Sequence, residues 1–124
     1  MTVTTPLRVC VAGVTGWTGG EIARAVAAAA DLDLAGGIAR SAAGRRLDEL
    51  VPGALPGVEV AADVETALAA GGIDVLVDYT HPSAVAGHAE AALARGVHVV
   101  IGTSGLDAAA YERIAAAAQA AGRG

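Results

Sequence analysis

Three glycines spaced three residues apart, Gly13, Gly16 and Gly19, form the first pattern in this chain with a chemical meaning. An apolar run precedes them and an Ala-rich segment follows, which predicts a turn from a strand into a helix. In such a turn the first glycine permits the tight bend, the second lets backbone N–H groups approach a pyrophosphate, and the third lets the helix pack closely. The helix N-terminus also favours an anion. The alternative is a purely structural turn. The candidate pyrophosphate-binding residues are Gly13, Val14, Thr15, Gly16, Trp17, Thr18 and Gly19.

The residues after the second apolar run bear on which dinucleotide would bind. An NAD site usually has an acid ~20 residues after the glycines, at the end of the second strand, for the ribose 2′-OH. Asp31 and Asp33 have about this spacing but lie at the start of the run Leu32–Ile38, while Arg40 and Ser41 follow its end. A cation and a hydroxyl there favour a 2′-phosphate. We therefore expect a preference for NADP(H), with NAD(H) possible. The alternative is that Arg40 and the arginines after it form a solvated surface cluster.

Two later loops carry polar residues at the ends of apolar runs. Ligands in open α/β sheets bind beyond the carboxyl ends of the strands. We expect Tyr79 to flank the nicotinamide, and Thr80, Thr103 and Ser104 to form hydrogen bonds with ribose or amide groups, with Gly102 beside them. Thr80 is also placed to cap the helix that follows it. The two roles of Thr80 are compatible.

The remaining reactive residue types do not form a catalytic set. Cys10 lies in an apolar run and is expected to be an inert core thiol. His88 and His98 are expected to be structural, whereas His81 lies at the end of a strand, where it can approach a cofactor. Paired acids, a metal-spaced cluster and a nucleophile with a base are all missing from the pattern. The chain alone is therefore predicted to hold no catalytic residue and no metal site.

Alternating strands and helices must position these loops, and they predict an α/β fold: a Rossmann-type, doubly wound parallel sheet in three layers. The run Val97–Ile101 is continuously apolar apart from His98, which predicts burial on both faces. The predicted strands are Leu7–Ala12, Leu32–Ile38, Val58–Val60, Ile73–Tyr79 and Val97–Ile101. The predicted helices are Thr18–Ala30, Asp63 to about Ala70, Pro82–Arg95 and Asp107–Ala121, with a short helix or loop at Ser41–Leu50.

Composition excludes several classes of function. The chain has 124 residues, 13 acids against eight arginines, a net charge of −5 and one cysteine. A basic stripe for nucleic acid is missing, as are a disulfide framework and an apolar run of ~18 residues that could span a membrane. The N-terminus lacks the features of a signal peptide, so a cytoplasmic protein is expected. With 54% hydrophobic and 2% aromatic residues, small aliphatic side chains must make the core.

Three motifs in order resemble one family, the N-terminal domain of 4-hydroxy-tetrahydrodipicolinate reductase (dihydrodipicolinate reductase). They are VAGVTGWTGGEI at 11–22, DVLVDYTHP at 74–82 and VVIGTSGL at 99–106. The resemblance implies that residues 13–18 bind the pyrophosphate and that Arg40 contacts the adenosine ribose or its phosphate. It also implies that Tyr79 and Thr80 line the nicotinamide side, and that residues 102–104 close the pocket.

The chain departs from this family at two positions and in length. Many members have Arg-Met where this chain has Trp17-Thr18, and an acid where it has Ala39, which disfavours use of NADH. The family's second α/β domain, with a His-His and Lys motif and a substrate-binding Gly-Thr segment, is absent from these residues. We therefore expect residues 1–124 to be a truncated NAD(P)-binding domain, inactive alone.

The resemblance implies a reaction for the full-length protein. That reaction is hydride transfer from NAD(P)H to a heterocyclic dicarboxylate, giving tetrahydrodipicolinate for lysine and diaminopimelate synthesis, in a homo-oligomer. Two alternatives stay open. One is a stand-alone nucleotide-binding or redox-sensing module without turnover. The other is the N-terminal domain of a semialdehyde or acyl-phosphate reductase, although such enzymes need a nucleophilic cysteine and Cys10 lies in a strand.

Overall fold

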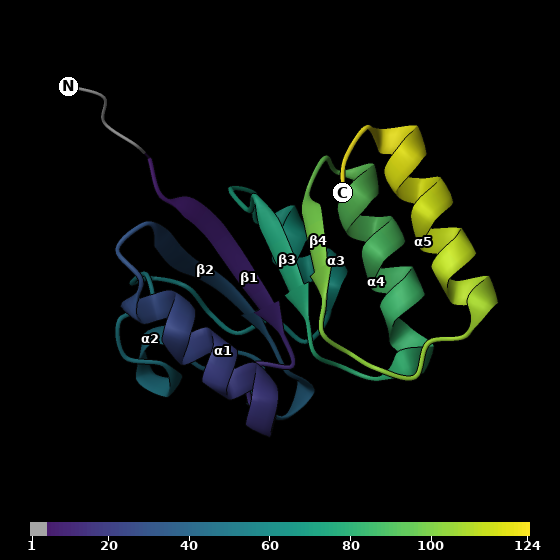
Figure 1. Ribbon diagram of the computed structural model, residues 1–124. Helices are drawn as coiled ribbons and strands as arrows, with labels where there is room; N and C mark the ends of the chain where they lie inside the picture. The colour runs from purple at the N-terminus through teal and green to yellow at the C-terminus, as the bar shows by residue number, and fades with distance from the viewer. Residues whose placement is uncertain (1–4) are drawn as a thin grey trace.

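The computed structural model describes residues 5–124, which form one parallel sheet with the strand order β2-β1-β3-β4 (Figure 1). The strands are β1 (Leu7–Ala12), β2 (Leu32–Ile38), β3 (Val75–Asp78) and β4 (His98–Ile101). The helices are α1 (Trp17–Ala28), α2 (Leu47–Leu50), α3 (Val64–Ala69), α4 (Pro82–Ala94) and α5 (Ala108–Ala121), with a 3-10 turn at Arg40–Ala42. The predicted Rossmann-type α/β fold is confirmed.

Helices cover both faces of the sheet, because side chains along a strand point alternately to opposite sides. Val9 and Val11 of β1 lie in one core cluster with Ala23 and Val26 of α1. Cys10 and its neighbours on the other face pack with residues of α3 and α4. The sheet is therefore the middle of three layers, as expected.

The carboxyl ends of the four strands lie in one row. Ala12 of β1 pairs with Ile38 of β2 and with Asp78 of β3, and Asp78 pairs with Ile101 of β4. After β1 the chain enters α1 on one face, whereas after β3 it enters α4 on the other. This change of face between adjacent strands is the position where open α/β sheets bind ligands.

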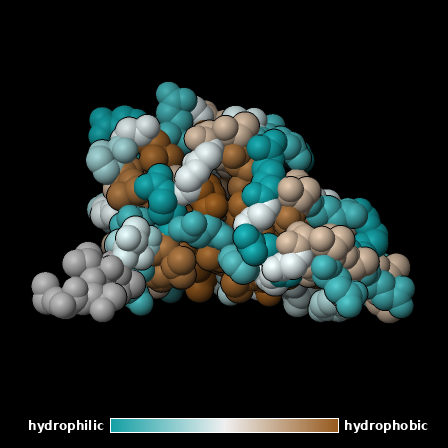
Figure 2. Space-filling model, turned by 90° about the horizontal axis from the view of Figure 1, so that it is seen from above, coloured by the Kyte–Doolittle hydropathy of each residue, from teal (hydrophilic) through white to brown (hydrophobic). Residues whose placement is uncertain are grey.

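Figure 2 views the opposite end, from above the amino ends of the strands. Hydrophobic residues gather in the middle of this face and hydrophilic residues lie around them. The apolar interior therefore extends to the amino end of the sheet.

The strand predicted at Val58–Val60 is wrong. Glu59 forms only an isolated bridge with Arg46, and Ala61 one with Ile38. The preceding segment contains two prolines and two glycines with positive φ, so it turns too tightly to extend. Val60 is buried in the α1-side core cluster, which explains its apolar character. The sheet accordingly has four strands in the described residues instead of the five expected.

The burial predicted for Val97–Ile101 on both faces is also wrong. His98 is exposed and the side chain of Val100 is 53% exposed. The last helix, α5, packs beside α4, and none of its residues is buried. Within residues 5–124, one face of β4 therefore lacks a covering helix. An apolar strand sequence alone does not show whether both of its faces are covered.

Other boundaries differ by one to three residues. β3 and β4 are shorter than predicted, and α1 begins one residue earlier, at Trp17. The segment Ser41–Leu50, expected as a short helix or loop, contains the end of the 3-10 turn and the one-turn helix α2. Asp63 caps α3 as predicted, with its carboxylate accepting a 2.7 Å hydrogen bond from the Thr66 N–H.

Candidate functional site

Two hollows open at the carboxyl ends of the strands. Hollow A has a volume of about 480 Å³, and its walls include the predicted residues Gly16, Trp17, Thr18, Gly19, Tyr79, Thr80, Gly102, Thr103 and Ser104. Hollow B has a volume of about 450 Å³, and its walls include the predicted residues Gly13, Thr15, Arg40, Ser41 and Thr80, together with His81 and His88. Thr80 lines both hollows. The structure therefore brings the residues of all four predicted loops to two adjoining spaces.

The glycine loop between the hollows requires two of its three glycines for the fold itself. Gly13 has φ +84°, and a Cβ there would overlap the carbonyl oxygen of Tyr79. A Cβ on Gly19 would overlap the carbonyl oxygen of Gly13, so the close approach of α1 to the loop requires glycine. Gly16 differs, since its Cβ would meet only the Gly13 oxygen, at 3.3 Å. The middle glycine is thus the one whose role is least explained by packing.

The first turn of α1 fits a pyrophosphate. Gly16 is the N-cap and provides no side-chain hydrogen bond to the helix. The first N–H groups of a helix have no acceptor within the helix, and they favour an anion. Because Gly16 also has no side chain, backbone donors can come close to phosphate oxygens. Trp17 begins the helix with 90% of its surface exposed and lines hollow A instead of joining the core.

Val14 is the one predicted binding residue that neither hollow includes. Its side chain is 4% exposed and belongs to the α1-side core cluster. Its backbone N–H donates to the carbonyl oxygen of Ile38 at 3.2 Å. Val14 therefore holds the loop on the sheet.

Arg40 and Ser41 follow β2 and line hollow B as predicted. Among residues 5–124, Arg40 has no acid within ion-pair distance, whereas Arg46 pairs with Asp48 at 2.9 Å and with Glu49 at 3.5 Å. The cationic segment thus presents one unpaired guanidinium to hollow B.

An acid also lies in the wall of hollow B. Asp63 caps α3, and its hydrogen bond from Thr66 N–H lowers the pKa of its carboxyl below the ordinary value. Asp63 is therefore charged at neutral pH. Hollow B combines one arginine with one acid that is already engaged at a helix end.

Tyr79 and Thr80 lie where β3 gives way to α4. The Tyr79 ring packs directly over Gly102, because a Cβ on Gly102 would overlap the ring. The expected capping of α4 by Thr80 is wrong: His81 is the N-cap, and its Nδ1 accepts from the Ser83 N–H at 3.2 Å. Pro82 is the first helical residue, so Thr80 is one position too early. Its hydroxyl donates instead to Asp78 Oδ1.

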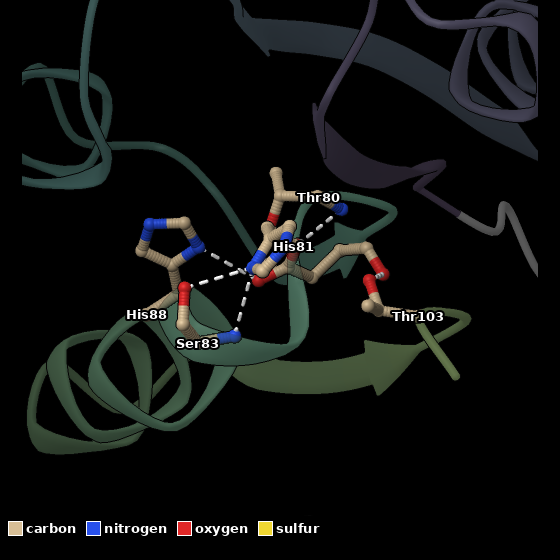
Figure 3. A network of polar contacts seen from close by, with 6 residues as sticks. Thr80, His81, Ser83, His88 and Thr103 are labelled. Atoms are coloured by element: carbon tan, nitrogen blue, oxygen red, sulfur yellow. Dashed lines mark hydrogen bonds and ion pairs between the residues drawn. The ribbon is translucent and has the colours of Figure 1, made fainter. Parts of the chain in front are cut away.

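Asp78 and His88 form a polar pair beside the hollows that the sequence patterns did not single out as functional. Asp78 is completely buried, and His88 Nδ1 lies 2.8 Å from its Oδ2 (Figure 3). The structural role expected of His88 agrees with this pair, yet His88 also lines hollow B. An acid as the last residue of an apolar strand was the available signal, because a buried carboxylate must find partners.

Cys10 is inert, as expected. Burial, with a smaller contribution from the charge of Asp78, raises the pKa of its thiol to about 12. A thiolate is the nucleophilic form, so this cysteine cannot serve the thioester chemistry of a semialdehyde or acyl-phosphate reductase. Residues 5–124 hold no group of three His, Cys, Asp or Glu side chains that could bind a metal. In the same range no helix is long and apolar enough to cross a membrane.

Comparison with known sequences points to one family. Residues 7–123 match the family model described as dihydrodipicolinate reductase, N-terminus. A 4-hydroxy-tetrahydrodipicolinate reductase of Synechococcus sp. (strain CC9605) is 44% identical over 115 residues, covering 84% of this chain and 41% of the relative. The enzyme of the same name from Symbiobacterium thermophilum is 41% identical over 121 residues, covering 96% and 48%. The chain thus spans less than half the length of these relatives.

Solved structures agree with this assignment. A dihydrodipicolinate reductase from Paenisporosarcina sp. TG-14, solved with dipicolinate bound, matches with a TM-score of 0.76 and 25% identity, over 94% of this chain and 44% of that one. GenD2 from gentamicin A biosynthesis, solved in complex with NAD, matches with a TM-score of 0.76 and 25% identity over 99% of this chain and 34% of its own. The glycine loop, the two strand-end loops and these matches lead to one conclusion: the chain belongs to the dihydrodipicolinate reductase family and corresponds to its N-terminal, nucleotide-binding domain.

Proposed function

We propose that hollows A and B together bind one molecule of NADP(H). The observation that carries the proposal is that Thr80 lines both hollows and that the glycine loop contributes residues to each of them. The loop of residues 13–19 would hold the pyrophosphate, and hollow A the nicotinamide side. Arg40 and Ser41 in hollow B would hold the adenosine ribose and its 2′-phosphate.

The preference for NADP(H) over NAD(H) is supported by charge. The Arg40 guanidinium has no acidic partner in the described chain, and a guanidinium binds phosphate through paired, charge-assisted hydrogen bonds. Ala39 stands where an acid would be expected to bind a free 2′-OH. Asp63 opposes the preference, but its carboxylate is occupied at the N-terminus of α3. Arg40 therefore decides the selectivity.

We further propose that residues 1–124 serve as the cofactor-binding domain of a reductase that acts on a dihydrodipicolinate-type heterocycle. The activity would belong to lysine and diaminopimelate biosynthesis, in a cytoplasmic homo-oligomer. When bound, the dinucleotide supplies a hydride. The residues of this chain bind and orient it, and they include no candidate for proton donation to a substrate. The chain alone is expected to bind NADPH without oxidising it in the presence of the substrate, which the absorbance of NADPH would follow.

Calorimetry with NADPH and NADH tests the cofactor assignment. We expect NADPH to bind about tenfold to a hundredfold more tightly, which is the range for hydrogen bonds to a charged group. Arg40→Ala should remove this difference. Arg45→Ala is the matched control: the Arg45 side chain has no ion-pair partner in the described chain, yet it does not line hollow B. Equal affinities in the unchanged protein, or an equal loss in both variants, would contradict the proposal.

Gly16→Val tests the pyrophosphate position separately from the fold. Because space around Gly16 is limited only by the Gly13 oxygen, at 3.3 Å, we expect the variant to fold. Its branched side chain would occupy the space in front of the helix N-terminus, so binding of both dinucleotides should be lost. Unchanged affinity in a folded variant would show that the loop is only a turn.

A further inference from the structure

Asp78 is the only buried charged or polar residue among residues 5–124, and its exposed fraction is 0%. It ends β3, beside β1, where α1 and α4 leave toward opposite faces of the sheet. A buried carboxylate is unfavourable unless hydrogen bonds replace its water. All buried side-chain nitrogen and oxygen atoms in this range have a partner, so that cost is met.

The bonds of Asp78 reach two of the three segments that line hollow A, the loop after β3 and the loop after β4. Its Oδ1 accepts from the Thr80 backbone N–H at 3.0 Å and from the Thr80 hydroxyl at 2.5 Å. Its backbone oxygen accepts from the Gly102 N–H at 3.0 Å. The same oxygen accepts from the Thr103 hydroxyl at 3.2 Å (Figure 3). Its Oδ2 faces His88 Nδ1. One residue therefore fixes the loop after β3 and the loop after β4.

The direction of these bonds determines what the threonines can offer a ligand. A hydroxyl has one proton to donate and two lone pairs to accept with. Thr80 and Thr103 both direct their proton to Asp78, so each presents only lone pairs to hollow A. Such a surface binds ribose hydroxyls or a carboxamide N–H group. It does not bind phosphate oxygens, which carry no proton at neutral pH.

We propose that Asp78 is a positioning residue, which fixes Thr80 and Thr103 as hydrogen-bond acceptors for the ribose hydroxyls or carboxamide of the nicotinamide half of the dinucleotide. The inference rests on the proposed function above. Asp78 is buried, and it holds Thr80 through its carboxylate and Thr103 through its backbone oxygen. Thr80 and His88 also line hollow B, but Arg40, which would hold the 2′-phosphate there, makes no hydrogen bond or ion pair with Asp78 in the described residues.

Two variants and two ligands test this role. The ligands are NADPH and 2′,5′-ADP, which represents only the adenosine half with its 2′-phosphate. In Asp78→Ala we expect the affinity for NADPH to fall about tenfold or more, whereas that for 2′,5′-ADP changes less than about twofold. In Asp78→Asn the carboxamide oxygen still accepts from Thr80, so NADPH affinity should return to within about threefold of the original.

A purely structural role predicts other results. With such a role, Asp78→Ala would lower the affinities for both ligands equally, and that outcome would overturn the proposal. Failure of Asp78→Asn to restore NADPH binding would also overturn it. Failure of the unchanged protein to bind either ligand would overturn the proposed function as well, so the two failures are distinguishable. If Asp78→Ala does not fold, Thr80→Val replaces it, since valine keeps the size of threonine and removes the hydroxyl. The same selective loss of NADPH affinity is expected in Thr80→Val. An equal change in the affinities for NADPH and for 2′,5′-ADP would overturn the proposal.

The protonation of His88 gives a spectroscopic signature that does not depend on any ligand. In the neutral ring, the nitrogen that faces the Asp78 carboxylate, Nδ1, should carry the proton. In Asp78→Asn the oxygen stays with Thr80 and the carboxamide NH₂ faces His88, so the proton should move to Nε2. Nitrogen-15 chemical shifts of the ring distinguish the two forms. An unchanged shift would overturn the arrangement of donors and acceptors around Asp78.

Discussion

The two halves of the sheet, β2 with β1 at one edge and β4 at the other, differ in how helices cover them. On the side of β1 and β2, Val11 and Leu34 are completely buried, and α1 adds Ala23 and Val26 to the same core cluster. On the side of β4, Val100 is half exposed, and α5 contributes no buried residue. The same kind of apolar sequence therefore produces a closed core on one side and an open edge on the other.

This difference divides the candidate site. The glycine loop and the segment with Arg40 stand on the closed side, where core packing and backbone hydrogen bonds together fix the backbone. The loop of residues 102–105 stands on the open side, where its link to the rest of the site is the Asp78 carbonyl and the Tyr79 ring over Gly102. The proposed phosphate side of the site is thus anchored in the closed core, whereas the proposed nicotinamide side depends on the contacts of Asp78 and Tyr79.

The largest effect is expected on the closed side, from Gly19→Ala. The added Cβ would overlap the Gly13 carbonyl oxygen, and neither backbone segment can move without opening the core. We expect the free energy of unfolding in urea to fall by about 3 kcal/mol or more, at the upper end for overpacking. A loss of unfolding free energy below about 1 kcal/mol would show that the backbone on the α1 side can shift as easily as that on the β4 side.

Truncation of one apolar side chain on each side compares the two directly. Leu34→Ala removes a fully buried side chain and should cost about 2–5 kcal/mol of unfolding free energy. Val100→Ala, at a half-exposed position, should cost less than about 1 kcal/mol. Urea unfolding of both variants measures the contrast. Similar losses would mean that another surface covers β4 in solution.

Alkaline pH should weaken the centre of the sheet through Cys10. Its pKa is about 12 in the folded protein against 9.0 ordinarily, so the folded state keeps its proton when the unfolded state loses it. The resulting stability is fully present below pH 9 and is lost toward pH 12, by about 1 kcal/mol between pH 9 and 10. Urea unfolding at these pH values measures it.

Cys10→Ala is the control for this titration, because it removes the thiol and leaves all tyrosines and arginines in place. Its unfolding free energy should fall less steeply with pH than that of the unchanged protein. Equal slopes would mean that the thiol is accessible to water in the folded state.

The smallest effect expected is a gain, from Gly87→Ala. Gly87 lies in the middle of α4, the helix that packs on β4 and α5, and a Cβ there meets no atom within 4 Å. Alanine should raise stability by about 0.5–1 kcal/mol. If the β4 side opens locally, backbone amide hydrogen exchange in Gly87→Ala should slow more in β4 than in β1, relative to the unchanged protein. Equal slowing in both strands would indicate a single cooperative unit.

Much of the closed side could be predicted from the sequence. Leu7–Ala12, the glycines after it and Leu32–Ile38 form long patterns with clear stops, and the structure places them as expected. Val58–Val60 was not predictable in the same way, because two valines around Glu59 can pack into a core without pairing as a strand. The exposure of Val100 depends on where α5 packs, which is a tertiary property. The role of Asp78 depends on partners two, ten and 25 residues away, so no local pattern contains it.

Trp17 gives the protein a built-in optical reporter. It is the sole tryptophan of the chain, it lies in the wall of hollow A, and 90% of its surface is exposed. Unfolding changes the surroundings of such an indole little, whereas a ligand in hollow A covers it. A change in tryptophan fluorescence on titration would therefore report occupancy of the site and not loss of the fold. Every variant described above can be assayed for binding without a label.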